Sequence, residues 1–195
     1  FFFQAEDAIR DVERSRGLGD VYKRQATPQL EDPNFRRSVV LMIEHGFEGS
    51  LGVVLNRPST TSLDGVLPGW ALTTGSPSRI FSGGPVQPDA LLALAPTSTA
   101  WVGSTQVTEQ IAMLDLEADI DPDQIDATSV RYFIGYSGWS PGQLGFEIEE
   151  GAWWTFESTN DVLLLDPMDC WSRVLARQKS AARFLAVHPE QAHLN

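Results

Sequence analysis

Residues 39–55 read VVLMIEHGFEGSLGVVL, two apolar runs separated by a polar stretch that holds two glycines. Short apolar runs bounded by glycine are typical of strands. The pair therefore predicts an antiparallel hairpin, with a loop longer than the two-residue minimum. Both runs are continuous rather than alternating, which indicates that both faces of the strand pair are buried.

Further apolar runs broken by Gly or Pro predict more strands along the chain. They are Ile80–Phe81, Leu91–Ala95, Ile111–Leu116, Val130–Ile134 and Val162–Leu165. Between them, the stretch Thr60–Ser78 is rich in Gly, Pro, Ser and Thr, which predicts a long surface loop.

One helix start is marked by Ser140-Pro141-Gly142-Gln143. The serine hydroxyl can cap the helix, proline suits its first turn, and the glutamine can reach back to the amide of the cap. Gly151 supplies a left-handed stop. With Leu144 and Ile148 on one face, the spacing predicts an amphipathic helix of about three turns.

A second helix start follows the same logic at Asp166-Pro167, where the carboxylate can cap and proline again opens the helix. A third helix is expected over residues 181–187. Strands come first and helices gather after residue 140, which predicts an α+β fold with a mostly antiparallel sheet rather than an alternating parallel one.

The composition narrows the class of partner. The formal net charge is −12 over 195 residues, so the average field repels phosphate backbones and anionic membrane surfaces. Direct nucleic-acid binding is therefore disfavoured. A single cysteine, Cys170, cannot form an internal disulfide, and no apolar run is long enough to span a bilayer. We expect a cytoplasmic protein with no membrane contact.

Residues 1–25 differ from the rest of the chain, because three aromatic residues are followed by a dense run of charges without an apolar period. The order is the reverse of a secretory signal. The segment resembles translated sequencing-adapter read-through, so we expect it to be non-native and a single domain to occupy residues 26–195.

Four blocks of sequence carry a family resemblance. Residues 32–58, DPNFRRSVVLMIEHGFEGSLGVVLNRP, are followed in order by GGPV at 83–86, GYSGWSPGQL at 135–144, and an Asp-to-Trp block at 161–171. In this order and spacing they resemble the AlgH/YqgE family over residues 26–195. The resemblance implies coiled, partly split β-sheets with a few helices, and a family label of transcriptional regulator.

The chain departs from the family pattern at three places. An apolar strand normally precedes the position of Ala26, an acidic residue normally stands at the position of Gly145, and many members have Cys at the position of Ile43. Thiol chemistry at position 43 is thereby excluded.

Glu44-His45 is the most suggestive chemical pair, because a carboxylate beside an imidazole can transfer protons or hold a metal. The plainer interpretation is a loop histidine tied to backbone, because adjacent strand residues leave opposite faces. GYSG at 135–138 lacks the final glycine of a nucleophile elbow, so Ser137 is a poor nucleophile and a tight strand-to-helix turn is expected instead. No spacing of Cys and His predicts zinc, and we expect no cofactor.

The remaining hypothesis is a recognition surface built from polar and glycine-rich turns. Its candidate residues are Glu44, His45, Asn56, Arg57, Gly83, Gly84, Gly135, Tyr136, Trp139, Gln143 and Glu147. The sequence therefore favours a non-catalytic binding or regulatory protein whose partner is a protein or a small ligand, with any effect on transcription being indirect. The alternative is an enzyme, such as a hydrolase, that uses the Glu44/His45 region.

Overall fold

A computed structural model describes residues 35–67, 79–99, 103–116, 129–179, 183 and 186. The strands are β1 (Val40–Gly46), β2 (Gly49–Val54), β3 (Pro58–Ser62), β4 (Arg79–Ser82), β5 (Val86–Pro96), β6 (Thr105–Gln106), β7 (Ile111–Met113) and β8 (Arg131–Trp139). The helices are α2 (Leu63–Val66), α3 (Gln143–Glu149) and α4 (Pro167–Ala176), with 3-10 turns η2 (Thr97–Thr99) and η5 (Asn160–Leu164). The expected non-native segment 1–25 and most of the expected helix 181–187 lie outside the described residues.

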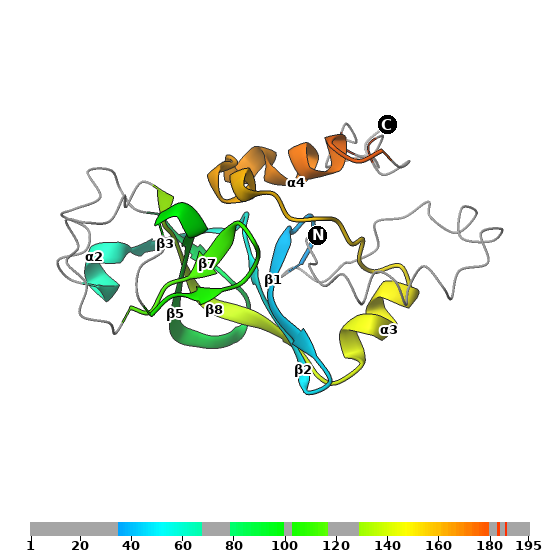
Figure 1. The fold of residues 1–195 in the computed structure, drawn as a ribbon, viewed down its shortest axis with the longest axis horizontal. Coiled ribbons are helices and arrows are strands. Elements are labelled where there is room, and N and C mark those ends of the chain that lie inside the picture. Colours follow the sequence, from blue (N-terminus) through cyan, green and yellow to red (C-terminus); the bar gives the residue numbers. More distant parts are fainter. Residues whose placement is uncertain are drawn as a thin grey trace.

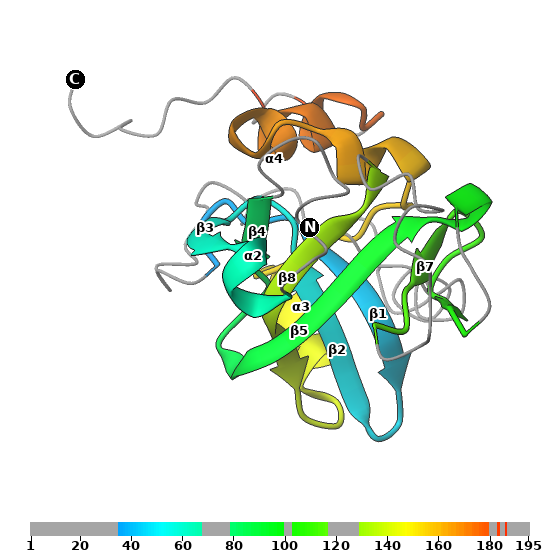
Figure 2. The same cartoon turned by 90° about the vertical axis from the view of Figure 1, so that its left-hand side faces the viewer.

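Strand β8 is the centre of the sheet. The order is β1-β2-β8-β5-β7-β6, while β4 also pairs with β8 and β3 pairs with β4 (Figure 1). Every pairing is antiparallel except β4 with β8. The long strands β5 and β8 run side by side with a strong twist (Figure 2). The predicted α+β fold with a mostly antiparallel, coiled sheet is confirmed.

The β1–β2 hairpin forms as predicted, but its loop is shorter than expected. Gly46 pairs directly with Gly49, so only Phe47 and Glu48 make the turn. The polar residues assigned to the loop instead extend the strands, because backbone pairing continues past the apolar run. A bulge between Met42 and Glu44 lets the strand cross from its buried half to its exposed half.

Successive residues of β1 and β2 enter two different cores, which confirms that both faces are buried. We call the first core the α4 cluster: Val39, Leu41, Val53, Leu55, Phe81, Leu94, Ile111, Phe133, Val162, Leu163, Leu165, Cys170, Trp171, Val174 and Leu175. We call the second the α3 cluster: Val40, Met42, Val54, Trp139, Leu144, Ile148 and Trp153. Because side chains alternate along a strand, α3 and α4 cover opposite faces of the hairpin.

Segment 135–138 is strand rather than the expected strand-to-helix turn. Gly135 has a φ of +66°, a left-handed conformation that favours glycine, and it lies inside β8. A Cβ on Gly83 would stand 2.2 Å from the carbonyl oxygen of Gly135, and one on Gly84 would stand 2.3 Å from the carbonyl carbon of Tyr136. These glycines let the chain leaving β4 cross β8 backbone against backbone.

Helix α3 begins later than the sequence predicts. Its N-cap is Gly142 rather than Ser140, no side chain caps it, and it spans seven residues. Half of the predicted capping box is present, because the Ser140 amide donates to Gln143 Oε1 at 3.0 Å. The predicted stop is confirmed: Gly151 has a φ of +78°, and the Ala152 amide donates to the Glu147 carbonyl at 2.9 Å.

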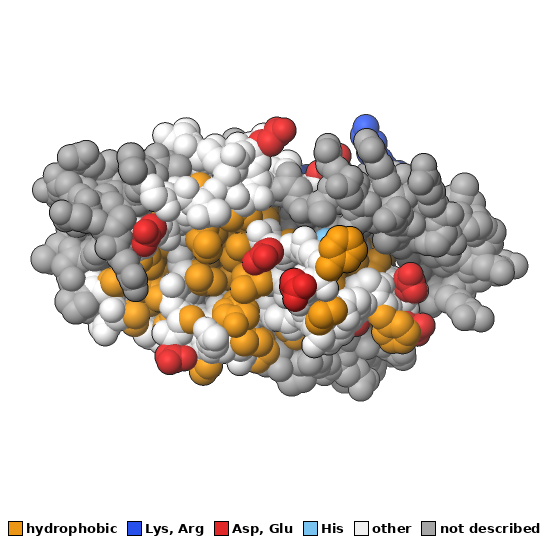
Figure 3. Space-filling model, turned by 60° about the horizontal axis from the view of Figure 1, so that its bottom comes forward, with side chains coloured by type: hydrophobic (Ala, Val, Ile, Leu, Met, Phe, Trp, Pro, Cys, Tyr) orange, Lys and Arg blue, Asp and Glu red, His pale blue; other side chains and the backbone are white. Residues whose placement is uncertain are grey.

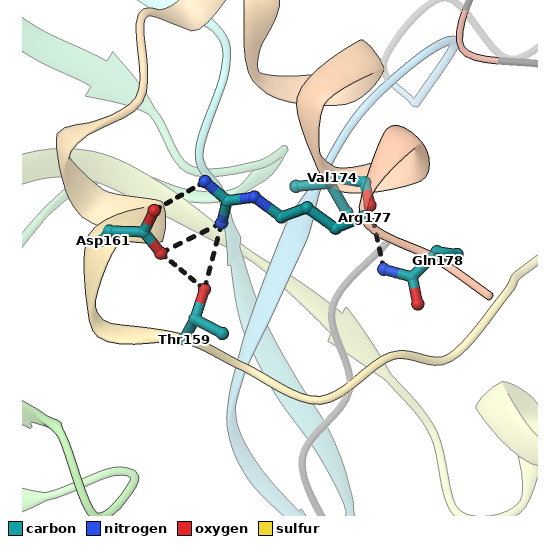
Figure 4. Close-up of polar contacts among 5 residues, drawn as sticks. All are labelled: Thr159, Asp161, Val174, Arg177 and Gln178. Atoms are coloured by element: carbon teal, nitrogen blue, oxygen red, sulfur yellow. Dashed lines mark hydrogen bonds and ion pairs between the residues drawn. The ribbon is translucent and has the colours of Figure 1, made fainter. Parts of the chain in front are cut away.

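Helix α4 begins as predicted, with Asp166 Oδ1 accepting from the Met168 amide at 2.9 Å and Pro167 in the first turn. The predicted strand Val162–Leu165 is wrong, because the segment is the 3-10 turn η5. Val162, Leu163 and Leu165 fill the α4 cluster without pairing to a strand. Arg177 at the end of α4 binds Asp161 of η5 through contacts of 3.0 and 2.6 Å, with Thr159 beside the carboxylate (Figure 4).

Two smaller predictions also need correction. The expected loop 60–78 contains the end of β3 and the short helix α2 before the described residues break off at Leu67. The expected strand Ile111–Leu116 is reduced to β7, although the Leu114 amide still donates to the Ala93 carbonyl at 2.9 Å in the register of the β5–β7 pairing. No helix within the described part of the chain is long and apolar enough to span a membrane.

Candidate functional site

Glu44 and His45 lie on the exposed half of β1 rather than in a loop. Glu44 pairs with Leu51 and His45 with Ser50, so their side chains leave opposite faces of the strand. His45 Nδ1 lies 2.7 Å from Ser50 Oγ, so the imidazole has a side-chain partner on the facing strand. Partial burial lowers the pKa of His45 below its ordinary value, which favours the neutral imidazole.

Asn56 and Arg57 hold the chain that precedes β1. The Asn56 side chain accepts from the Val39 amide at 2.9 Å and donates to the Arg37 carbonyl at 2.8 Å. Arg57 donates to the carbonyl of Arg36. These contacts fix the entry into the hairpin.

The glycine residues of the predicted surface lie in the crossing of β4 and β8. Gly83 and Gly135 are buried, and the buried Ser137 hydroxyl donates to the Gly83 carbonyl at 3.1 Å. Ser137 therefore has a packing contact rather than an exposed nucleophilic hydroxyl. Tyr136 is half-buried against the α4 cluster.

Three of the predicted residues come together around one carboxylate. Glu147 Oε2 accepts from the indole nitrogens of Trp139 at 3.0 Å and Trp153 at 2.7 Å, while Oε1 accepts from Gln143 Nε2 at 2.9 Å. Strand β8 supplies Trp139, α3 supplies Gln143 and Glu147 at i,i+4 spacing, and the chain after the Gly151 stop returns Trp153 to the same place. Local helix geometry and the helix stop thus build one polar centre.

This centre lines a cavity of about 300 Å³, which we call the Glu147 pocket. Its lining residues are Phe35, Pro85, Gly138, Trp139, Gln143, Glu147, Ala152 and Trp153. Reasoning from the sequence did not assign Trp153, Phe35 or Pro85 to the candidate surface. The usable signals were the helix stop at Gly151 and the hydrogen-bonding ends of the two indoles.

Burial also lowers the reactivity of two other groups, the thiol of Cys170 and the phenol of Tyr132. Burial raises the pKa of the Cys170 thiol to about 11 and that of the Tyr132 phenol to about 12, so both stay protonated at neutral pH. No group of three His, Cys, Asp or Glu side chains in the described ranges is placed to hold a metal ion.

The hairpin tip and α3 form one end of the molecule. A Cβ on Gly49 would stand 2.6 Å from the Trp139 carbonyl oxygen, so the hairpin tip lies directly against the turn that leads to α3. Phe47 at the tip is 99% exposed and Phe146 on α3 is 64% exposed. We call residues 44–50 and 139–150 the acidic end.

The acidic end is named for its charges. Its carboxylates belong to Glu44, Glu48, Glu147, Glu149 and Glu150. Residues 38–56 and 132–172, which supply this end, contain no lysine or arginine. Among the described residues on the face in Figure 3, acidic and hydrophobic side chains are mixed, and Lys and Arg are visible at the upper margin.

The family model and the most similar relatives identify the same family. The chain matches the AlgH-like family over residues 25–183. It is 43% identical over 177 residues to a UPF0301 protein of Streptomyces avermitilis, covering 87% of this chain and 92% of the relative. A UPF0301 protein of Mycolicibacterium vanbaalenii is 44% identical over 170 residues, covering 84% of this chain and 85% of the relative.

Two solved structures share the fold. The crystal structure of protein DIP2367 from Corynebacterium diphtheriae has a TM-score of 0.73 at 28% identity and covers 82% of this chain and 87% of its own. The solution structure of the AlgH protein from Pseudomonas aeruginosa has a TM-score of 0.61 at 29% identity and covers 84% and 90%. The resemblance recognised in the sequence blocks is confirmed.

Proposed function

The chain belongs to the AlgH-like family, and we propose that it is a non-catalytic cytoplasmic protein that regulates a partner protein by binding it at the acidic end. An effect on transcription would then pass through that partner rather than through DNA.

The observation that carries the proposal is the exposure of Phe47 and Phe146 among glutamates. Large apolar side chains that face water are typical of interaction sites, because their burial against a partner releases hydrophobic free energy. The surrounding carboxylates favour a partner with a basic surface and would speed its encounter. The same carboxylates disfavour nucleic acid, in keeping with the net charge of −12.

The test compares two pairs of exposed apolar residues. In the Phe47→Ser/Phe146→Ser variant, partners captured by the wild-type chain should be lost, with binding of each purified partner weakened at least tenfold. The control variant Leu164→Ser/Met168→Ser changes side chains that are 62% and 87% exposed near α4, and it should keep those partners. Equal capture by all three proteins, measured by affinity purification and mass spectrometry, would refute the proposal.

A second measurement addresses nucleic acid directly. Gel-shift titration with random and genomic duplexes at low salt should give no tight complex. Tight, salt-sensitive binding would overturn the assignment of the acidic end as a protein-binding surface.

Hydrolysis near the hairpin is the second candidate function, and one contact favours it. The 2.7 Å contact between His45 Nδ1 and Ser50 Oγ is the hydroxyl–imidazole arrangement that activates a nucleophile. Glu44 leaves the opposite face of β1 and does not orient the imidazole as a third member would. Ester and phosphoester hydrolysis that disappears in both His45→Ala and Ser50→Ala, with the fold intact, would establish this activity.

A further inference from the structure

The carboxylate of Glu147 is held in one orientation by three neutral donors. Trp139 and Trp153 donate to Oε2 at 3.0 and 2.7 Å, and Gln143 donates to Oε1 at 2.9 Å. A carboxylate offers about four lone-pair sites, so Oε1 retains capacity for one more donor. None of the three donors carries a positive charge, and Glu147 has no cationic partner among the residues with described positions.

Aromatic rings surround this carboxylate. Trp139 and Trp153 meet at 79° with centroids 5.8 Å apart, and Phe35 meets Trp153 at 73° with centroids 5.4 Å apart. Because neighbouring rings stand nearly perpendicular, they form walls rather than a stack. The negative face of an aromatic ring attracts a cation within about 6 Å of its centre.

The size of the pocket limits what can enter. Its volume of about 300 Å³ is at the lower limit of small-molecule sites. The pocket therefore suits the end of a side chain better than a nucleotide or a large cofactor. Its charge disfavours anions, because a phosphate or carboxylate would be placed against Glu147, and none of the described lining residues carries a positive charge to offset the repulsion.

We propose that the Glu147 pocket receives a side-chain cation, the ammonium of a lysine or the guanidinium of an arginine, presented by the partner protein. The cation donates to the remaining acceptor site on Glu147 Oε1 and packs its alkyl stem against Phe35, Trp139 and Trp153. This cation would be the specific contact within the wider acidic end. That a partner protein supplies it rests on the proposed function.

The experiment uses the full chain and small probes of defined charge. N-acetyl-arginine amide and N-acetyl-lysine amide are titrated into ¹⁵N-labelled protein, and the indole resonances of Trp139 and Trp153 are followed. The neutral isostere N-acetyl-citrulline amide is the control ligand. We expect both cations, or one of them, to shift the two indole resonances saturably, and the citrulline probe to leave them in place. The stronger of the two cations identifies the side chain that the pocket prefers.

A matched pair of variants isolates the carboxylate. Glu147→Gln should weaken cation binding about tenfold, because a charge-assisted hydrogen bond is replaced by a neutral one. Glu157→Gln, an exposed glutamate outside the acidic end, should bind as the wild type does. A salt series needs only the wild-type protein: its affinity for the cation should weaken as ionic strength rises. This salt series keeps the test decisive if Glu147→Gln does not fold.

Several results would overturn the inference: no shift with either cation, equal shifts with citrulline, salt-independent binding, or unchanged affinity in a folded Glu147→Gln variant. Loss of partners in Phe47→Ser/Phe146→Ser, together with failure of the cation titration, would retain the proposed function and remove only the cation pocket. Cation binding without any dependence of partner capture on the two phenylalanines would instead refute the proposed function.

Discussion

Helices α3 and α4 pack on opposite faces of the same hairpin but compensate charge in different ways. On the α4 side, arginines are used internally: Arg177 pairs with Asp161, and Arg37 lies 4.7 Å from the centre of the Trp171 ring. On the α3 side, the half-buried carboxylate of Glu147 meets only neutral N–H donors. The arginines on the α4 side therefore have partners within the chain, whereas the Glu147 carboxylate on the α3 side can still bind a cation.

The half-buried Arg131 shows how the α4 side provides partners for a cation. Its guanidinium donates to the carbonyls of Leu55 at 3.1 Å and Leu165 at 2.9 Å, and it lies 4.5 Å from the centre of the Phe81 ring. Burial lowers the pKa of Arg131 from its ordinary value, with the nearby Cys170 and Asp166 acting in the opposite direction. We infer that α4 serves to cover one face of the hairpin. Helix α3 covers the other face and also lines the Glu147 pocket.

The largest expected effect separates a buried phenylalanine from an exposed one. Phe133→Ala opens a cavity in the α4 cluster and should lower the free energy of unfolding by about 3–5 kcal/mol. Phe146→Ala removes a side chain that is 64% exposed and should change it by less than about 0.5 kcal/mol. Urea unfolding measures both. Comparable losses would mean that Phe146 is a packing residue and would break the contrast between the two helices.

The next effect concerns the carboxylate of the Glu147 pocket. Glu147→Ala leaves the indole N–H groups of Trp139 and Trp153 without their acceptor, which should destabilise the fold by about 1–3 kcal/mol. Glu149→Ala, on the exposed side of the same helix, is the control and should change stability by less than about 0.5 kcal/mol. If denaturation midpoints of the two variants coincide, the indole–carboxylate contacts contribute nothing to folding.

Removing the residue at the start of each helix should have a smaller effect on stability, and the effect should differ between α4 and α3. Asp166→Ala removes the acceptor for the Met168 amide and should cost about 1 kcal/mol. Ser140→Ala should cost almost nothing, because no side chain caps α3. Thermal unfolding of the two variants tests the difference. A loss in Ser140→Ala equal to that in Asp166→Ala would restore serine as the cap that the sequence predicted.

The smallest effect is a pH dependence on the α4 side. Hydrogen bonds from Arg177 and then Thr159 lower the pKa of Asp161 below its ordinary value of 3.8, so the folded state favours the carboxylate. This stability is present above the unfolded-state pKa and is lost as the pH falls through the folded-state pKa. The side chains of Arg177 and Asp161 are 39% and 44% exposed, so we expect only a few tenths of a kcal/mol, on the order of a screened surface pair.

Asp161→Asn provides the check on that pH dependence. The wild type should be more stable than the variant at neutral pH, and the difference should shrink as the pH falls below 3.8. Asp169→Asn, whose carboxylate lies 3.7 Å from Arg173, is the weaker-paired control. A stability difference that grows on acidification would reverse the sign and rule out the ion pair as its source.

Local patterns predicted the parts of the fold whose stabilising partners are close in sequence. The Gly151 helix stop and the Asp166 cap depend on contacts within a few residues, and the β1–β2 hairpin pairs two segments that follow one another directly in the chain. The prediction for Val162–Leu165 was wrong for the opposite reason: a short apolar run can be buried as a strand or as a 3-10 turn. The choice depends on a neighbouring strand elsewhere in the chain.

The candidate site divides in the same way. Gln143 and Glu147 were both among the candidate residues, and their i,i+4 spacing places them side by side on one helix. Phe35 and Pro85 were not assigned to the site, because they come from distant parts of the sequence and reach the pocket only through the crossing strands. Glu44 and His45 were grouped on one surface, but the alternation of β1 sends their side chains to opposite faces.

By itself, the sequence determined the family, the class of fold, the acidic character and the two marked helix ends, since these follow from residue order and short-range geometry. Only the tertiary structure decided that two indoles and an amide converge on Glu147, and that Gly49 of the hairpin lies against the turn leading to α3. Those arrangements arise where β8 brings together segments that are far apart in the chain. Local sequence patterns do not predict which distant segments will be in contact.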